Sequence, residues 1–341
     1  MSALKTIWIL SHARRGDLDQ MLALARALGW PATVKRLAFR TPKLAAIPFL
    51  ARHLFDKAHS DPIDPPWPDL VLCAEGRASA IARLIQVRSA GAVKTCCLGR
   101  PAGSPAPFDL VLTTPQFRLP AGANIVELAL PLRPEAAQVS GGEFAKLARP
   151  LIAVLAGGTS MPERLDRQAA VALAKAVLKH DRGGSFVFIT SPRTDPSAAA
   201  ALAKAVPAPH IVHLWQRDGD NPYWRILAAA DHVVVTSDSV SMAIDAFAAG
   251  KPVSIYRLPQ HHTVKNRAVN WLHGRRAAAW LFDHGIVELR PDRRLLFEKL
   301  VAQGRLRWFG EAPATETRPL CVADETALAV ANVRRLFADL S

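Results

Sequence analysis

Short apolar runs alternate with amphipathic stretches along the chain. An apolar run of four or five residues bounded by polar residues, Gly or Pro predicts a buried strand, and apolar residues spaced three or four apart predict a helix. The first part has strands predicted at 6–10, 33–37, 70–73, 94–98, 110–113 and 125–128, with helices at 18–28 and 79–88. This alternation is typical of βαβ units and a parallel sheet.

The pattern restarts after a Gly-containing loop at 138–142. Strands are predicted at 151–155, 186–189, 211–214, 232–235 and 253–256, and helices at 165–178, 198–206, 223–230 and 241–249. A polar stretch at 311–320 then precedes an amphipathic helix at 324–340. We therefore expect an α/β protein with domains at 1–140 and 141–320 and a C-terminal helix, 321–341, that packs back on the first domain.

Composition agrees with two folded domains. The chain has 341 residues, of which 50% are hydrophobic and 21% charged, a balance that argues against disorder. No apolar run reaches the ~18–20 residues of a membrane span, and the first residues lack the pattern of a cleavable signal. Four cysteines without CxxC spacing suggest neither a zinc site nor a disulfide framework. The expected location is cytoplasmic.

The charge is strongly basic. The formal net charge is +14, and residues 1–60 carry ten basic against three acidic residues. Such a bias predicts a polyanionic partner, although a solubilising surface explains it equally well. The segment 36–55 mixes Arg and Lys with Leu, Ile and Phe. It fits either a patch lying peripherally on the anionic inner membrane or a partly buried helical hairpin.

Polar loops follow three predicted strands of the second half, where ligands bind in open α/β sheets. Gly-Gly after a strand lets a backbone approach a ligand, and a following helix N-terminus can bind phosphate. Asp245, one helical turn beyond Ser241, could accept both hydroxyls of a ribose. Each loop alone also fits an ordinary turn or a capped helix. The candidate binding residues are Gly157, Gly158, Thr159, Ser160, Ser191, Arg193, Thr194, Thr236, Ser237, Asp238, Ser239, Ser241, Met242 and Asp245.

The first half offers three candidate general bases. His12, Asp17 and Glu75 each follow or end a predicted strand. Each could therefore face a ligand cleft at the carboxyl end of that strand. A helix cap or a surface position is the alternative for each of them. Later in the chain, Lys265 is expected to face a phosphate or an acceptor.

A set of short motifs is spread over nearly the whole chain. The motifs are Trp8-Ile9-Leu10, Gly16-Asp17 with Gln20, Asp69-Leu70-Val71, Gly76-Arg77, Leu155–Gly158, Thr236–Met242, Gly250-Lys251-Pro252-Val253, Lys265, Pro319-Leu320 and Glu325-Thr326. Together they resemble the bacterial branch of the mitochondrial-fission Elm-type (elongated-mitochondria) family, and the stretch 236–253 is the most specific part of the resemblance.

That family resembles glycosyltransferases of the GT-B type. The resemblance implies two Rossmann-like domains facing across a cleft, with acceptor and base on the first and donor on the second. An acidic residue five positions before a glycine holds the donor ribose in those enzymes, and Asp245 and Gly250 have that spacing. The family more often has Glu at the first position, and often a Gly-His pair where this chain has Gly16-Asp17.

The function expected from this resemblance is transfer of a sugar from a nucleotide-diphosphate donor to a lipid-linked or envelope glycan acceptor. We expect no cofactor and no nucleic-acid partner. Neither DxD spacing, 17–19 or 218–220, suits a donor-side metal, so metal-independent transfer is favoured. A non-catalytic adaptor that recruits a partner in organelle fission is the main alternative. A sugar-nucleotide epimerase is another.

Overall fold

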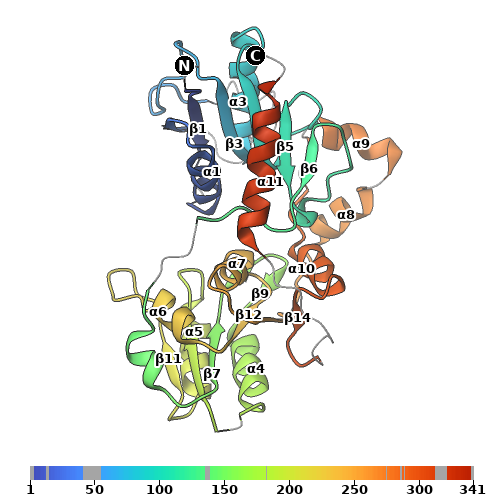
Figure 1. Cartoon of the computed structure of the whole chain (residues 1–341). Coiled ribbons are helices and arrows are strands. Elements are labelled where there is room, and N and C mark those ends of the chain that lie inside the picture. The colour runs from blue at the N-terminus through green and yellow to red at the C-terminus, as the bar shows by residue number, and fades with distance from the viewer. Residues whose placement is uncertain are drawn as a thin grey trace. The chain divides into compact units, whose positions relative to one another are not determined.

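The chain forms two compact units, described here from a computed structural model (Figure 1). Unit 1 consists of Met1–Pro134, Val264–Asp292 and Val322–Ser341, and unit 2 of Glu135–Thr263 and Arg293–Cys321. The structure describes residues 4–12, 15–40, 55–134, 139–181, 183–273, 275–284, 286–287, 289–311 and 321–338.

Unit 1 is built on a parallel sheet of six strands in the order β2-β1-β3-β4-β5-β6. The strands are β1 (Ile7–Ser11), β2 (Ala32–Arg36), β3 (Leu70–Gly76), β4 (Lys94–Pro101), β5 (Leu110–Thr113) and β6 (Ile125–Glu127). The helices are α1 (Arg15–Leu28), α3 (Arg77–Arg88), α8 (Val264–Leu272), α9 (Arg276–Asp283) and α11 (Val322–Arg335), with a short 3-10 turn, η1 (Pro115–Phe117), after β5.

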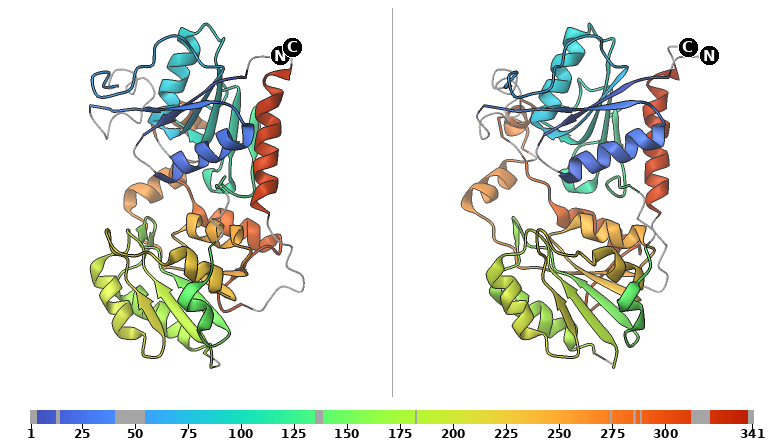
Figure 2. Two further views of the ribbon diagram at one scale, coloured as in Figure 1. Left: turned by 60° about the vertical axis from the view of Figure 1, so that its left-hand side comes forward. Right: turned by 90° about the vertical axis from the view of Figure 1, so that its left-hand side faces the viewer.

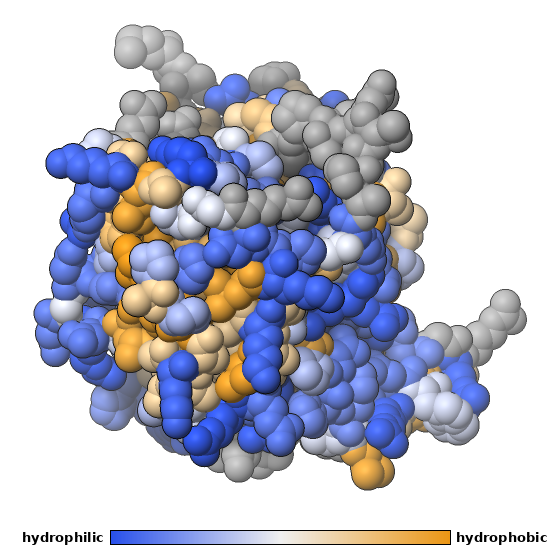
Figure 3. Space-filling view, turned by 90° about the horizontal axis from the view of Figure 1, so that it is seen from below, coloured by the Kyte–Doolittle hydropathy of each residue, from blue (hydrophilic) through white to orange (hydrophobic). Residues whose placement is uncertain are grey.

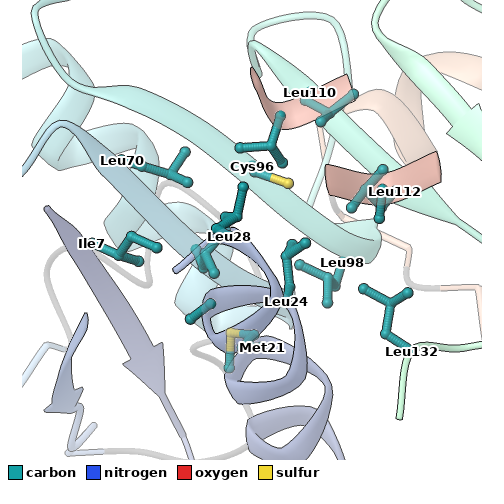
Figure 4. Close-up of a cluster of buried hydrophobic side chains, with 14 of the residues drawn as sticks. Ile7, Met21, Leu24, Leu28, Leu70, Cys96, Leu98, Leu110, Leu112 and Leu132 are labelled. Carbon is teal, nitrogen blue, oxygen red and sulfur yellow. The ribbon is translucent and has the colours of Figure 1, made fainter. Parts of the chain in front are cut away.

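Side chains of this sheet alternate between two cores, as the two-residue period of a strand requires. Ile7 and Ile9 of β1 lie in the core that α1 and α11 cover, whereas Trp8 and Leu10 lie in the core beneath α3. Figure 4 shows the first of these cores. Its members Ala329 and Val333 come from α11, which lies against α1 (Figures 1 and 2).

Unit 2 also has a parallel six-stranded sheet, in the order β11-β10-β7-β12-β13-β14. The strands are β7 (Leu151–Leu155), β10 (Ser185–Ile189), β11 (Ile211–His213), β12 (His232–Thr236), β13 (Val253–Tyr256) and β14 (Arg307–Trp308). The helices are α4 (Arg167–Leu178), α5 (Pro196–Ala205), α6 (Tyr223–Ala229), α7 (Val240–Ala248) and α10 (Arg293–Ala302). Two short strands, β8 (Thr159–Ser160) and β9 (Glu163–Arg164), pair antiparallel, and η2 (Gly142–Lys146) precedes β7.

The predicted α/β class is confirmed, and every predicted strand is observed within two or three residues of its expected ends. That the units face across a cleft stays a prediction. Helices α8, α9 and α10 and strand β14 were not predicted. Most of the basic segment 36–55 lies outside the described residues.

One stretch belongs to a different unit from the one expected. Residues 264–292 were assigned to the second domain, but they group with unit 1. Arg118, after η1, explains this grouping, since its Nη1 donates to Asn270 Oδ1 at 3.2 Å and its Nη2 to the Arg290 carbonyl at 3.0 Å. In addition, the Asp292 N–H donates to the Gln116 carbonyl at 2.8 Å.

The surface is mixed in character. Figure 3 shows an apolar area surrounded by hydrophilic residues on the face seen from below. Within the described ranges, no helix combines the length and the apolar character needed to cross a bilayer.

His232, at the amino end of β12, is held in its neutral form. Arg307 Nε donates to Ser254 Oγ at 2.8 Å, and Ser254 Oγ lies 2.9 Å from His232 Nε2. Arg307 Nη2, which can only donate, lies 3.4 Å from the same nitrogen. His232 Nε2 therefore accepts from both groups and Nδ1 carries the proton. Burial, with Arg307 as the second cause, lowers the pKa of His232 to about 4.

This pKa predicts acid sensitivity. In the unfolded chain His232 takes up a proton below about pH 6.5, whereas the fold holds it neutral down to about pH 4. The free energy of unfolding should therefore fall by up to about 3 kcal/mol as the pH drops from 6.5 to 4. Urea unfolding across this range measures the loss. His232→Gln should flatten the slope and His261→Gln, at an exposed position, should not; equal slopes in all three proteins would contradict the assignment.

Candidate functional site

The order of strands in unit 2 reverses between β7 and β12. From β7 the chain continues through β10 to β11 on one side, and from β12 through β13 to β14 on the other. Open parallel sheets bind ligands at such a switch point, beyond the carboxyl ends of the strands. Because β10, β7 and β12 are neighbours in the sheet, the three predicted polar loops that follow them meet at this point.

The carboxylate of Asp238 lies at the centre of these loops. It accepts the Gly158 N–H at 2.8 Å and the Thr236 hydroxyl at 2.7 Å, and Arg193 Nη2 lies 3.3 Å from it. Asp238 is 2% exposed. Burial raises the pKa of Asp238 above its ordinary value, and these three partners act in the opposite direction. One buried charge thus links the loops after β7, β10 and β12.

Both glycines after β7 are required by close packing within the protein. A Cβ on Gly157 would lie 2.3 Å from Asp238 Oδ2, and one on Gly158 would lie 2.2 Å from the Arg193 carbonyl oxygen. The Gly157 N–H donates to Thr236 Oγ1 at 2.8 Å. Both glycines thus make room for the neighbouring loops, and that they also let a ligand approach the backbone stays a prediction.

The helix predicted at 165–178 is observed as α4, which begins at Arg167, where Asp166 accepts the Ala169 N–H. Between Gly158 and this helix the chain forms the β8–β9 hairpin, which was not predicted. A buried ion pair holds the hairpin in place, because Arg293 Nη2 lies 2.8 Å from Glu163 Oε2. No local sequence pattern indicates this pair, because its residues are 130 positions apart.

The loop after β10 supports the first loop and reaches toward the third. The hydroxyls of Ser191 and Thr194 both donate to the Gly157 carbonyl. Arg193 extends from the same loop, with its side chain 44% exposed, and donates to Ser239 Oγ at 3.2 Å. Its guanidinium is therefore both paired with Asp238 and partly open to solvent.

The N-terminus of α7 lies beside that guanidinium. Ser239 precedes the helix, and its hydroxyl lies 3.5 Å from that of the exposed Ser241. The first N–H groups of a helix have no partner within the helix and favour an anion. Two hydroxyls, one guanidinium and a helix N-terminus thus converge on a place where a phosphate group would be stabilised.

Asp245 is more enclosed than expected. It lies on α7 and is 5% exposed, and its Oδ2 accepts the Tyr223 hydroxyl of α6 at 3.0 Å. No sequence pattern marks Tyr223 as a site residue, because an aromatic residue in a predicted helix is expected in the core. A ribose at Asp245 would have to share the carboxylate with this hydroxyl.

Five other predicted residues lie apart from the network. Thr159 and Ser160 form β8, the Ser237 hydroxyl accepts the Leu258 N–H at 3.0 Å, and Met242 is half-buried on α7. Lys265 lies on α8 of unit 1, and its side chain is outside the described residues.

Unit 1 has a switch point of its own, between β1 and β3. His12, Asp17 and Glu75, the three candidate bases, line one small pocket there. The His12 ring meets the edge of Phe39, with 5.0 Å between ring centroids. No cluster suited to a metal ion was found in the described part of the chain. The pocket is equipped for proton transfer by a carboxylate or an imidazole.

A buried thiol, Cys97, lies on β4 opposite Cys73 of β3. Burial raises the pKa of Cys97 well above its ordinary value, and Cys73, Glu75 and Asp17 raise it further. Cys97 itself is fully buried and is a structural residue.

The chain is thus an α/β protein of two units, and each unit has a candidate site where the strand order of its sheet reverses. The chain matches the family model described as mitochondrial fission ELM1 over residues 15–335, and it belongs to that family.

Two curated relatives and one solved structure are similar to this chain. The mitochondrial fission protein ELM1 of Arabidopsis thaliana is 33% identical over 36% of this chain and 29% of its own length. The uncharacterized protein RP120 of Rickettsia prowazekii is 27% identical over 34% of each chain. These matches thus span about a third of the curated relatives. A solved structure, the S. aureus MnaA-UDP co-structure, aligns with a TM-score of 0.49 and 11% identity over 92% of this chain and 99% of its own; similarity at this level carries no inference about function.

The close packing around Gly157 predicts that one added methyl group at this position lowers the stability of the protein strongly. In Gly157→Ala the new Cβ would displace the Asp238 carboxylate and disturb its hydrogen bonds with Gly158 and Thr236. The free energy of unfolding should fall by roughly 2–4 kcal/mol in urea titrations.

Gly16→Ala is the matched control, because no atom lies within 4 Å of its added Cβ and the residue is helical. It should leave stability unchanged or raise it by up to about 1 kcal/mol. A Gly157→Ala protein as stable as the control would show that the Asp238 network does not hold the loops together.

Proposed function

We propose that the protein transfers a sugar from a nucleotide-diphosphate donor on unit 2 to an acceptor on unit 1. The observation that carries this proposal is the meeting of three polar loops at the switch point of unit 2, beside the N-terminus of α7. The diphosphate would lie against that N-terminus, with Arg193, Ser239 and Ser241 as donors. Asp245 would accept the ribose hydroxyls.

The acceptor is a lipid-linked or envelope glycan, and the transfer uses no metal ion. One of His12, Asp17 and Glu75 removes the proton from the accepting hydroxyl, since all three line the pocket of unit 1. Helix N–H groups and Arg193 offset the charge that develops on the departing diphosphate. The basic first sixty residues would lie against the anionic membrane that carries such an acceptor.

A second function, that of a non-catalytic adaptor in organelle fission, is favoured by one observation. The polar groups of the three loops largely bond to one another, as Gly157 does to Thr236 and Gly158 to Asp238, so the loops hold one another in place. An adaptor would keep this network for stability alone. Nucleotide binding separates the two functions, and product analysis with donor alone would reveal an epimerase.

Nucleotide binding should depend on the hydroxyls at α7. Ser239→Ala and Ser241→Ala should each weaken binding of uridine diphosphate in calorimetric titration and leave the folded protein intact. Asp245→Asn should lose about 1.5–3 kcal/mol, the range for hydrogen bonds to a charged group, or roughly tenfold to hundredfold in affinity.

Ser185→Ala is the control, because Ser185 lies at the amino end of β10, away from the loops. Wild-type affinity in all three variants, or no binding of nucleotide to the wild type, would refute the donor site and leave the adaptor.

The base should be identified by conservative replacement in unit 1. His12→Gln, Asp17→Asn and Glu75→Gln are compared for release of uridine diphosphate from a uridine-diphosphate sugar in the presence of acceptor. One variant should lose about 10²–10⁴-fold in turnover, the usual contribution of a general base. All three should bind uridine diphosphate normally, because the donor site belongs to unit 2. Normal turnover in all three would remove this pocket from the reaction.

A further inference from the structure

Helices α8 and α9 of unit 1 (Figure 1) carry a concentration of exposed apolar side chains. Nine large hydrophobic residues are exposed in the described part of the chain, and four of them lie in this short stretch: Val264, Trp271, Trp280 and Ile286. Trp271 and Trp280 are 63% and 57% exposed, and they are the only exposed tryptophans among the described residues. Single exposed apolar residues are ordinary, but such a concentration indicates an interaction surface.

The exposed residues of α8 follow its outer face. Its inner face packs in the small core of this helix pair through Val269 and Leu272. Val264, Ala268 and Trp271 are spaced four and three residues apart, so they share one side of the helix, and all three are exposed. An outer helix face is normally polar, whereas this one carries an apolar stripe.

The outer face of α9 has the same character. Ala278 and Phe282 are buried in the core that the two helices share. Trp280 is two positions from each of them and therefore lies on the opposite side of the helix. Both helices thus turn a tryptophan away from the fold.

Basic side chains accompany these apolar residues. Arg267 and Arg290 are exposed, and Arg275 Cζ lies 3.3 Å from the ring centroid of Trp271. Such a cation–π contact holds the guanidinium against the ring. From Val264 to Arg290 the sequence has five Lys or Arg residues and two Asp or Glu residues. The surface is therefore apolar and cationic at the same time.

This combination matches the headgroup region of an anionic bilayer. Tryptophan rings are enriched at the boundary between hydrocarbon and water, and Lys and Arg are attracted to anionic headgroups. A helix with aromatic and aliphatic residues beside cationic ones lies in the plane of that boundary. Nucleic acid would also attract the charge, but it offers Val264 and Ile286 no hydrocarbon to enter.

We propose that the outer faces of α8 and α9 bind the surface of an anionic lipid bilayer, with Trp271 and Trp280 at the level of the headgroups and the arginines on lipid phosphates. The proposal rests on the proposed function in one respect, because a lipid-linked acceptor would be presented to unit 1 at this bilayer. Binding to the lipid itself requires neither a sugar nor a nucleotide.

The test is sedimentation of the full chain with vesicles of phosphatidylcholine and phosphatidylglycerol. The wild type should bind, and less so as salt rises, because exposed charges are screened over ~10 Å at 0.1 M. Vesicles of phosphatidylcholine alone should bind much more weakly. Trp271→Ala and Trp280→Ala should each weaken binding to the anionic vesicles roughly tenfold, the effect of withdrawing one large apolar side chain. Arg267→Gln should weaken it about fivefold.

Val87→Ala and Arg88→Gln are the matched controls, because both residues are exposed on α3 of the same unit. Both should bind the vesicles as the wild type does. Wild-type affinity in all three variants of α8 and α9, or equal binding to neutral vesicles, would overturn the proposal. A dimer or an oligonucleotide complex that these variants abolish, while binding to lipid persists, would also overturn it and assign the surface to that partner.

Uridine diphosphate titrated into the same proteins without vesicles reports separately on unit 2. Lipid binding that depends on Trp271 and Trp280, without any nucleotide binding, would refute the proposed function alone. Nucleotide binding in a protein whose variants bind lipid equally well would refute this inference alone.

Discussion

The buried carboxylate of Asp238 is the interaction on which the site of unit 2 depends. A charge that is removed from water is tolerated only when it is paired and hydrogen-bonded, and here the partners come from three different loops. The need to satisfy this charge fixes the loops after β7, β10 and β12 in one arrangement. It also explains the two glycines, since any larger residue at Gly157 would occupy the place of the carboxylate.

The same constraint decides which groups remain for a ligand. Some polar groups form hydrogen bonds that hold the loops together: those of Gly157, Gly158, Ser191 and Thr194. Others border the N-terminus of α7: those of Arg193, Ser239 and Ser241. The polar residues of this site therefore fall into a supporting layer and an outer layer. Unit 1 differs, because His12, Asp17 and Glu75 line its pocket directly.

Local pattern was enough to predict every strand of the two six-stranded sheets except β14. Strands such as Leu151–Leu155 and Val253–Tyr256 are short apolar runs whose burial on both faces is visible in the sequence. The convergence of the polar loops was also predictable, because carboxyl ends of neighbouring parallel strands share an edge. The pairing within the loops was not: Gly158 and Asp238 are 80 residues apart, and Asp245 with Tyr223 involves two helices whose packing no local pattern reveals.

Helices α8 and α9 show a second reason why part of the fold could not be predicted from the sequence. Their own small core contains Ala278, Phe282 and Leu289, while Trp271 and Trp280 are exposed, so the apolar pattern does not follow one clean face. They belong to unit 1, where Arg118, from a distant part of the chain, donates to Asn270 and to the Arg290 carbonyl.

The division of the chain has a consequence for its synthesis. Unit 1 is made of three separate segments, and its core includes Ala329 and Val333 near the C-terminus. A ribosome that has completed the first 134 residues has therefore not yet supplied the helix that covers α1. Unit 2 lies almost wholly within the intervening sequence, so it can close its own core first. The unit that begins the chain is the last to be completed, and truncation from the C-terminus uncovers the N-terminal sheet.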